Sequence, residues 1–295
     1  MSADTQPLPR WSPAARFWIY LTVAPLGAGI GALVGAFFAA IWLLWEHETL
    51  LSFHQLSPAN RFLFTALIIS TAYPPLALLT LAFLRSVDRK SLQDVGLTRE
   101  GWSRHLFAGV LTGIGFLLCL FGTYAATGLV RFVLEEEVSW KHWLVMSLWL
   151  CPLIGFTEEL VFRGYLLLVA EEWRGRKFAV ALTSVLFWIA HLGQGNVHEP
   201  VGILATLCLS VTFAMARYLT GSLWFPVGLH TAYDWVALSF GGELGLGFPT
   251  LFRFELRAPA WLVGPPGHVG LLDTLAYMWL LAALLFAFRK RLSAL

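Results

Sequence analysis

Residues 143–170 read WLVMSLWLCPLIGFTEELVFRGYLLLVA, and this stretch decides the fold class. An apolar run of about 20 residues is long enough to cross the hydrocarbon core of a bilayer as a helix. Three ionisable residues interrupt the run, namely Glu158, Glu159 and Arg163. Charged groups are costly inside a membrane, so those that occur there usually pair with one another or line a site. The stretch therefore predicts a membrane-spanning helix that carries a polar site.

The composition of the whole chain agrees with a membrane setting. Of its 295 residues, 58% are hydrophobic and only 13% are charged, and the mean hydropathy is +0.69, values far from those of a soluble domain. The net charge of +2 is small and the basic residues lie between apolar runs, so nucleic acid is not expected as a partner. Cys119, Cys151 and Cys208 all fall within apolar runs, and we expect them to be packing residues.

Further apolar runs predict an all-α fold, a polytopic membrane protein built as a bundle of about eight transmembrane helices. The predicted helices cover residues 17–45, 62–84, 105–133, 143–170, 178–192, 201–219, 224–240 and 270–288. Residues 1–16 are expected to form a cytoplasmic arm and residues 17–295 a single transmembrane domain. The segment 241–268, rich in Gly and Pro, is expected to be an external loop.

The positions of Lys and Arg predict the orientation of the bundle, because cytoplasmic loops carry an excess of these residues. They collect in the loops 85–104 and 171–177 and in the tail around 289–291. Placing these segments inside puts both termini in the cytoplasm, which is consistent with eight crossings. The protein is thus expected to be a multi-pass integral membrane protein, in the plasma or inner membrane if it is bacterial.

Four ionisable residues on three of these helices are expected at a similar depth. Counted at about 1.5 Å per residue from the predicted cytoplasmic helix ends, Glu158, His191 and Asp234 lie roughly 18, 20 and 15 Å deep, and His230 roughly 9 Å deep. Polar pairs with independent structural roles would not need to lie at the same depth in the membrane. A common layer is what a shared intramembrane site requires.

Spacing along each helix suggests different roles for the polar residues. Glu159 and Arg163 are four residues apart and are expected to form an ion pair on one helical face. Glu158 points about 140° away from Arg163 and is expected to face a cavity. His230 and Asp234 are also four apart, so they either hydrogen-bond each other or converge on one point.

These residues together resemble the signature of a known family. Glu158-Glu159-x-x-x-Arg163, then Phe187-x-x-x-His191, then His230-x-x-x-Asp234 resemble the three motifs of the CPBP intramembrane endopeptidases, which include type II CAAX prenyl proteases and the Abi group of bacteriocin-processing or immunity proteins. Shorter stretches in the segments 94–97 and 221–226 add to the resemblance. It covers about residues 85–240.

The resemblance implies an intramembrane endopeptidase acting on a membrane-associated or prenylated, CAAX-type protein. Carried over by position, Glu158 would be the general base that activates water, and His191 would help to hold that water. His230 with the residue at position 234 would polarise the carbonyl or hold the developing oxyanion. Glu159, Arg163 and Phe187 would support the site.

Position 234 departs from the family pattern, because this chain has Asp where many members have Asn. A carboxylate is a poor hydrogen-bond donor to an oxyanion but a good metal ligand. A zinc-dependent mechanism with Glu158, His191, His230 and Asp234 as ligands therefore stays open beside the metal-free one. Four protein ligands would, however, leave little room for catalytic water.

Two other classes of function use the same residues. A proton-coupled transporter would use the carboxylates and histidines as a relay, and a noncatalytic, immunity-type scaffold would keep the site but act by binding. Other protease chemistries lack their parts, since the sequence has no HExxH and no GxSG motif.

Overall fold

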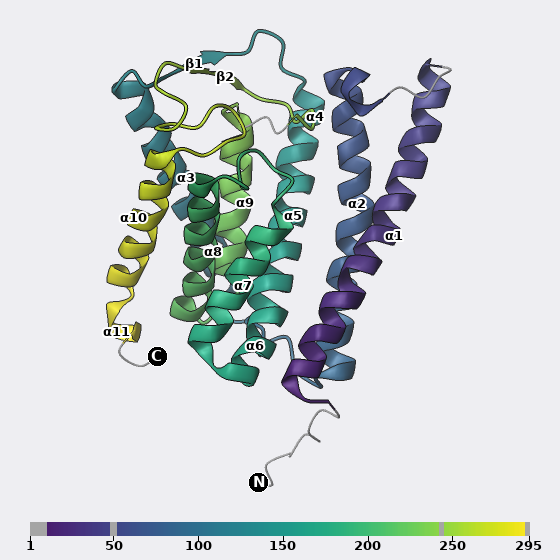
Figure 1. Ribbon diagram of the computed structural model, residues 1–295, viewed down its shortest axis with the longest axis vertical. Helices are drawn as coiled ribbons and strands as arrows, with labels where there is room; N and C mark the ends of the chain where they lie inside the picture. The colour runs from purple at the N-terminus through teal and green to yellow at the C-terminus, as the bar shows by residue number, and fades with distance from the viewer. Residues whose placement is uncertain (1–10, 48–51, 242–244, 293–295) are drawn as a thin grey trace.

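A computed structural model describes residues 11–47, 52–241 and 245–292, which form an up-and-down helical bundle (Figure 1). The predicted all-α membrane fold is confirmed, with 73% of the structure helical. The helices are α1 (Pro13–His47), α2 (Pro58–Ala82), α3 (Trp102–Ala126), α4 (Trp140–Val145), α5 (Cys151–Glu159), α6 (Leu167–Arg174), α7 (Arg176–Ala190), α8 (Pro200–Thr220), α9 (Trp224–Ser239), α10 (Leu271–Ala287) and the short α11 (Arg289–Leu292). A 3₁₀ turn, η1 (Phe53–Gln55), precedes α2.

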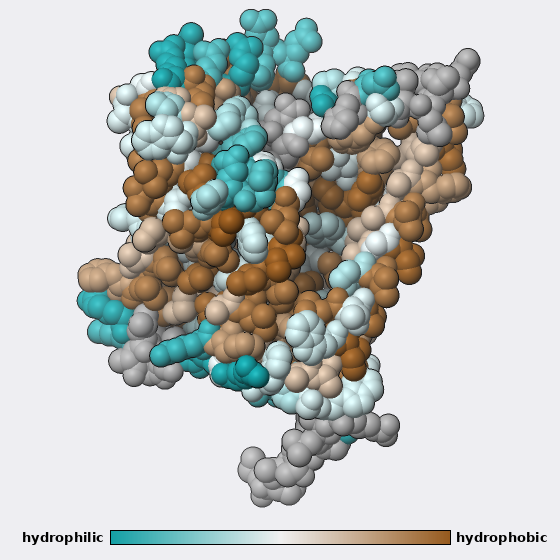
Figure 2. All heavy atoms as spheres, in the orientation of Figure 1, coloured by the Kyte–Doolittle hydropathy of each residue, from teal (hydrophilic) through white to brown (hydrophobic). Residues whose placement is uncertain are grey.

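In the described part of the chain, five helical runs are long and apolar enough to cross a membrane: Pro13–Trp45, Pro58–Val87, Trp102–Ala126, Trp140–Arg174 and Pro200–Thr220. The other predicted spans are helical but shorter, because α7, α9 and α10 have 15, 16 and 17 residues. Figure 2 shows a wide apolar zone between hydrophilic ends. The protein is an integral, multi-pass membrane protein.

The helical run that contains the glutamate pair is continuous from Trp140 to Arg174 but not uniformly α-helical. Two π-helical segments interrupt it, η3 (Met146–Leu150) and η4 (Leu160–Leu166). Each π segment adds an extra residue to a turn and is often found at functional sites. The second one begins immediately after Glu159, so it sets the direction of the side chains of the motif.

Two predictions, for the segments 105–133 and 241–268, are wrong. The third helix ends at Ala126 and not at residue 133, because Gly128 takes a left-handed φ of 71° and turns the chain away. Residues Val130–Leu134 then form strand β1, which pairs antiparallel with β2 (Phe252–Leu256). The segment 241–268 is therefore not only a loop, since it contributes β2.

The first helix begins earlier than predicted. It starts at Pro13, so the end of the expected arm is helical, while residues 1–10 of that arm lie outside the described residues. Arg16, which was assigned to the arm, is only 3% exposed and forms ion pairs with Asp88 and Glu172. This charge cluster connects α1 to the end of α2 and to α6.

Close backbone contacts hold two helix pairs together. A Cβ at Gly31 of α1 would lie 2.2 Å from the carbonyl oxygen of Thr71 in α2, so only glycine fits there. Likewise, a Cβ at Gly228 of α9 would lie 2.2 Å from the carbonyl oxygen of Leu106 in α3. The second contact packs α9 closely against α3. Two of the predicted site residues, His230 and Asp234, lie on α9.

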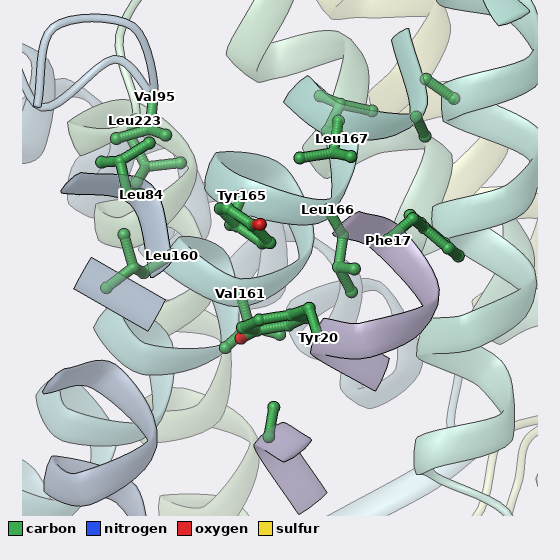
Figure 3. Close-up of a cluster of buried hydrophobic side chains, with 14 of the residues drawn as sticks. Phe17, Tyr20, Leu84, Val95, Leu160, Val161, Tyr165, Leu166, Leu167 and Leu223 are labelled. Atoms are coloured by element: carbon green, nitrogen blue, oxygen red, sulfur yellow. The ribbon is translucent and has the colours of Figure 1, made fainter. Parts of the chain in front are cut away.

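A buried apolar cluster packs around η4 at the end of the run nearest α6. Figure 3 shows Tyr20 of α1 beside Tyr165 and Val161 of η4, and the two tyrosine rings lie 4.5 Å apart between centroids. The Tyr165 hydroxyl donates a hydrogen bond to the buried carboxylate of Asp88 at 2.7 Å. The cluster thus fixes the helical segment that follows the glutamate pair.

Candidate active site

The four residues predicted to share a site lie close together in the structure. Oε2 of Glu158, near the end of α5, is 3.7 Å from Nε2 of His191 and 3.9 Å from Nε2 of His230. His191 directly follows α7, and His230 lies in the middle of α9. Nε2 of His230 is also 3.7 Å from Oδ2 of Asp234, one turn further along α9. Three helices therefore bring two carboxylates and two imidazoles to one point.

Glu159 is directed away from this point and is fully buried, as the spacing predicts. Its Oε1 accepts a hydrogen bond from Nη1 of Arg163 at 2.8 Å. The same oxygen lies 2.9 Å from Nδ1 of His230. The second amino group of Arg163, Nη2, donates to the hydroxyl of Ser210 at 2.8 Å and to its carbonyl oxygen at 3.2 Å. Arg163 thus connects the motif to α8 as well as to Glu159.

Aromatic rings enclose the charged groups. The Arg163 guanidinium lies 4.3 Å from the centroid of the Phe187 ring, a distance suited to a cation–π contact. The His191 imidazole lies 4.2 Å from the centroid of that ring. On the other side, the His230 ring stacks on Phe213 at 4.9 Å with an interplanar angle of 18°. Phe187 therefore fixes the position of both Arg163 and His191.

Hydrogen bonds at Nδ1 determine which nitrogen of each histidine faces the site. Nδ1 of His191 lies 2.7 Å from the carbonyl oxygen of Phe187, which can only accept. Nδ1 of His191 must therefore carry the proton, and a neutral ring presents a lone pair at Nε2. The same reasoning gives His230 a proton at Nδ1, because its partner there is the Glu159 carboxylate. Both Nε2 atoms face Glu158.

Tyr73 is a site residue that the sequence does not reveal. It lies on α2, and its hydroxyl donates a hydrogen bond to Oε1 of Glu158 at 2.9 Å. The second oxygen of Glu158, Oε2, is buried and has no hydrogen-bond partner among the described residues. Tyr73 occupies one carboxylate oxygen, and the other is left facing the two imidazoles. Ser210 and Phe213 on α8 are further contacts that no motif indicates.

The site lies in the wall of a cavity of about 520 Å³. Glu158, His191 and Asp234 have side chains 14%, 16% and 20% exposed, so they are accessible from it, whereas Glu159 has none of its side chain exposed. The remaining wall is mostly apolar and aromatic, with contributions from α2, α3, α8, α9 and the segment 246–269. Space for a substrate is therefore present beside the reactive groups.

The donor atoms of the site do not form a recognisable metal centre. Among the described residues, no group of three or more His, Cys, Asp or Glu side chains has the arrangement that would hold a metal ion. The donor atoms lie 3.7–3.9 Å apart, farther than the roughly 3.4 Å that ligands about 2.1 Å from a tetrahedral zinc would show.

Comparison with known proteins gives one match. Residues 140–236 match the family model described as type II CAAX prenyl endopeptidase Rce1-like. No curated protein and no solved structure matches the chain. The match covers about a third of the chain and includes all three motifs, whereas the residues from 85 to 139 lie outside it. The resemblance inferred from the motifs is confirmed, because residues 140–236 match the model of type II CAAX prenyl endopeptidases, and this match supports an intramembrane endopeptidase in general.

Proposed function

We propose that the protein is an intramembrane endopeptidase in which Glu158 activates water for attack on a peptide bond. The observation that carries this proposal is the distance of 3.7 Å between Oε2 of Glu158, which has no hydrogen-bond partner among the described residues, and Nε2 of His191. A water molecule between these two acceptors would donate one hydrogen to each, because Nδ1 of His191 already holds the ring proton. Its oxygen would then present a lone pair to a carbonyl carbon in the cavity.

The bond changes follow from this arrangement. The water oxygen forms a bond to the carbonyl carbon, and its proton passes to Glu158. The resulting tetrahedral intermediate carries a negative oxygen. When the C–N bond breaks, Glu158 returns the proton to the leaving amine, so the carboxylate is regenerated. Tyr73 keeps Glu158 aimed at the water through its hydrogen bond to Oε1.

His230 is the group best placed to hold the oxyanion. Its Nδ1–H is engaged with Glu159, and a second proton on Nε2, which makes the ring an imidazolium, turns Nε2 into a donor into the cavity. Asp234 cannot donate as a carboxylate. Its Oδ2 lies 3.7 Å from the same Nε2. We assign Asp234 the role of keeping the proton on Nε2 of His230 and of orienting the His230 ring. This role accounts for Asp where many family members have Asn.

The substrate is a membrane-embedded or lipidated protein. It would reach the site through the cavity, whose wall includes the first half of α2, the second half of α3 and the loop before α10. All of these lie at the end of the bundle that carries β1 and β2, away from the α6–α7 turn (Figure 1). The excess of Lys and Arg at the opposite end supports a non-cytoplasmic location for this end.

Comparative terminal proteomics tests the proposed function. Membranes from cells that contain the wild-type protein or the Glu158→Gln variant are compared for new peptide termini. The proposal expects a set of termini that depends on Glu158 and arises from membrane proteins. Identical termini in both samples, with the wild-type protein present and folded, would contradict it.

A further inference from the structure

A basic pocket of about 670 Å³ lies between the end of α2 and the start of α3, at the end of the bundle that carries α6. Four basic side chains line it, those of Arg85, Arg89, Lys90 and Arg99. No Asp or Glu is among the described residues of its wall. None of the four basic residues lines the cavity beside Glu158. The basic pocket is therefore separate from the candidate active site.

The acidic residues of the same segment are bound to other groups. Asp88 is 2% exposed, and its two carboxylate oxygens bind Arg16 and the hydroxyl of Tyr165. Oδ2 of Asp94 accepts hydrogen bonds from the backbone N–H of Ser91 at 2.7 Å and from its hydroxyl at 2.8 Å. Neither carboxylate therefore neutralises the basic side chains of the pocket.

The guanidinium groups of the pocket lack partners of opposite charge. In the described part of the chain, Arg85, Arg89 and Arg99 form no ion pair. Lys90 is paired, since its Nζ lies 2.8 Å from Oε1 of Glu172, but that contact is partly exposed. Cations that converge on one pocket repel one another, and an anion bound among them removes this repulsion. Guanidinium groups in particular match the oxygen geometry of a phosphate.

The backbone at Arg89 is strained, which supports a role for its side chain. Arg89 has a φ of 55° and is the only non-glycine residue with a positive φ in the described ranges. It follows the π-helical segment η2 (Phe83–Val87), and the next N–H, that of Lys90, bonds to the carbonyl oxygen of Leu84 at 2.9 Å. Glycine is the usual residue at a left-handed position after a helix. An arginine retained there places its charge at the pocket in spite of the strain.

The walls of the basic pocket are fixed by packing. Leu84 and Val95 are 1% and 0% exposed and belong to the same buried cluster as Leu223 (Figure 3). The backbone N–H of Leu223 bonds to the carbonyl oxygen of Gly96 at 2.8 Å, and Nε of Arg217 donates to that of Val95 at 3.2 Å. The pocket is therefore formed before any ligand binds, so little ordering opposes binding.

An exposed apolar face of α2 leads to the pocket. Pro75, Leu78 and Ala82 are exposed and lie three or four residues apart, and the exposed Arg85 continues the series. Leu78 is 67% exposed, and the helical run is long and apolar enough to span a membrane, so this face suits acyl chains. Trp102, 47% exposed at the start of α3, is typical of the headgroup level. The basic pocket thus lies where the apolar face ends.

We propose that the basic pocket binds the phosphate group of an anionic phospholipid, whose acyl chains lie along the exposed face of α2. Basic pockets beside membrane-spanning helices bind anionic headgroups. The orientation rule requires basic residues in this loop, but it does not require them to surround one pocket from which the carboxylates are turned away. The inference does not depend on the proposed peptidase activity.

Binding at this pocket is expected to stabilise the neighbouring helices. Arg89 directly follows Asp88, which connects α1 to Tyr165 in η4. Lys90 contacts Glu172 of α6, which also binds Arg16. A ligand that binds only the folded protein raises its melting temperature. Bound lipid should therefore be detectable both as a retained molecule and as a thermal shift.

The first test is native mass spectrometry of the full-length protein, purified in detergent and mixed with equal amounts of phosphatidylglycerol and phosphatidylcholine. We expect the wild-type protein to retain the anionic lipid at least about fivefold more often, since each basic residue near the headgroup contributes about a factor of five. The double variant Arg85→Gln/Arg99→Gln should retain the two lipids nearly equally.

The double variant Arg104→Gln/Lys177→Gln is the matched control. It removes the same charge from exposed positions of other helices, outside the basic pocket. Its preference for the anionic lipid should stay within about twofold of the wild-type value. An equal loss of preference in both double variants would overturn the inference, because it would show attraction to overall charge and not to the pocket.

Arg89→Gly is the second test, because it removes a charge and also relieves the strained backbone. Its melting temperature without lipid should equal or exceed that of the wild-type protein, whereas the increase caused by phosphatidylglycerol should fall by about half or more. Inorganic phosphate at tenfold higher concentration and constant ionic strength should cause no comparable increase. An unchanged lipid effect in Arg89→Gly would overturn the pocket assignment, and an equal increase with inorganic phosphate would overturn the lipid assignment.

Discussion

Nδ1 of His230 lies 2.9 Å from Oε1 of Glu159, the same oxygen that binds Arg163. The contact joins α9 to the run that contains α5 and η4. It also fixes the His230 ring so that Nε2 faces Glu158 and Asp234. Glu159 is therefore the residue that holds the site together, whereas Glu158, its neighbour in sequence, faces the cavity.

The two glutamates are thus expected to respond differently to one substitution. Glu159→Gln leaves the Arg163 guanidinium, only 1% exposed, without its counter-ion, and we expect a loss of about 3–5 kcal/mol of stability. Glu158→Gln keeps the volume, and it removes a carboxylate that has no ion pair with a Lys or Arg among the described residues. We expect its stability to change by less than about 1 kcal/mol. Thermal unfolding in the same detergent compares the two variants. Equal melting temperatures would contradict a structural role for Glu159 and a catalytic role for Glu158.

The spacing of residues along the sequence predicts contacts within one helix but not contacts between helices. The Glu159–Arg163 pair follows from the i,i+4 rule and is present at 2.8 Å. The bond from His230 to Glu159 depends on the rotation of α9 about its axis, which the close contact of Gly228 with α3 sets. Tyr73 reaches Glu158 across 85 positions, and nothing in the pattern of α2 marks it.

The difference between local and long-range contacts also explains where the predicted fold is wrong. The long apolar runs fix the helices, because crossing a bilayer demands length. Strands β1 and β2 have only five residues each and pair across more than a hundred positions, so they leave little periodic signal. Arg16 reads as a cytoplasmic flanking charge, yet it is buried because Asp88 and Glu172 compensate it. Such partners become visible only in three dimensions.

Tyr73→Phe tests whether the α2 tyrosine positions the catalytic carboxylate. The variant removes one hydrogen bond to a charged group, so we expect kcat to fall by about tenfold or more while KM changes little. Tyr233→Phe is the matched control, since its hydroxyl also lines the cavity but bonds to Tyr277 at 2.6 Å. Steady-state rates of cleavage of an apolar fluorogenic peptide measure both variants. A rise in KM alone at Tyr73 would instead assign it to substrate binding.

Asp234→Asn distinguishes the metal-free mechanism from the zinc-dependent one. An amide keeps the shape and adds an N–H donor toward the oxyanion, so we expect kcat/KM to stay within about tenfold of the wild-type value. Incubation with a strong chelator is likewise expected to leave activity unchanged. Loss of activity on chelation, restored by added zinc, would show that the site works through a metal.

The buried charges at the end of the bundle near α6 predict a second difference in stability. Arg16→Met leaves Asp88, whose side chain is fully buried, without its ion-pair partner, and we expect a loss of about 3–5 kcal/mol. Lys90→Met is the control, because the Lys90 pair with Glu172 is 32% and 27% exposed, and should cost less than about 1 kcal/mol. Thermal unfolding of the two variants compares their losses of stability. A larger loss for Lys90→Met than for Arg16→Met would contradict this prediction.

The most direct test of the catalytic role of Glu158 is hydrolysis by purified protein in liposomes. An apolar, amidated peptide is incubated in H₂¹⁸O with wild-type protein and with Glu158→Gln, and the products are identified by mass spectrometry. We expect the wild-type protein to produce two fragments, with ¹⁸O in the new carboxyl terminus. The variant should be folded and at least about a thousandfold slower. Cleavage at the wild-type rate by Glu158→Gln would contradict the account.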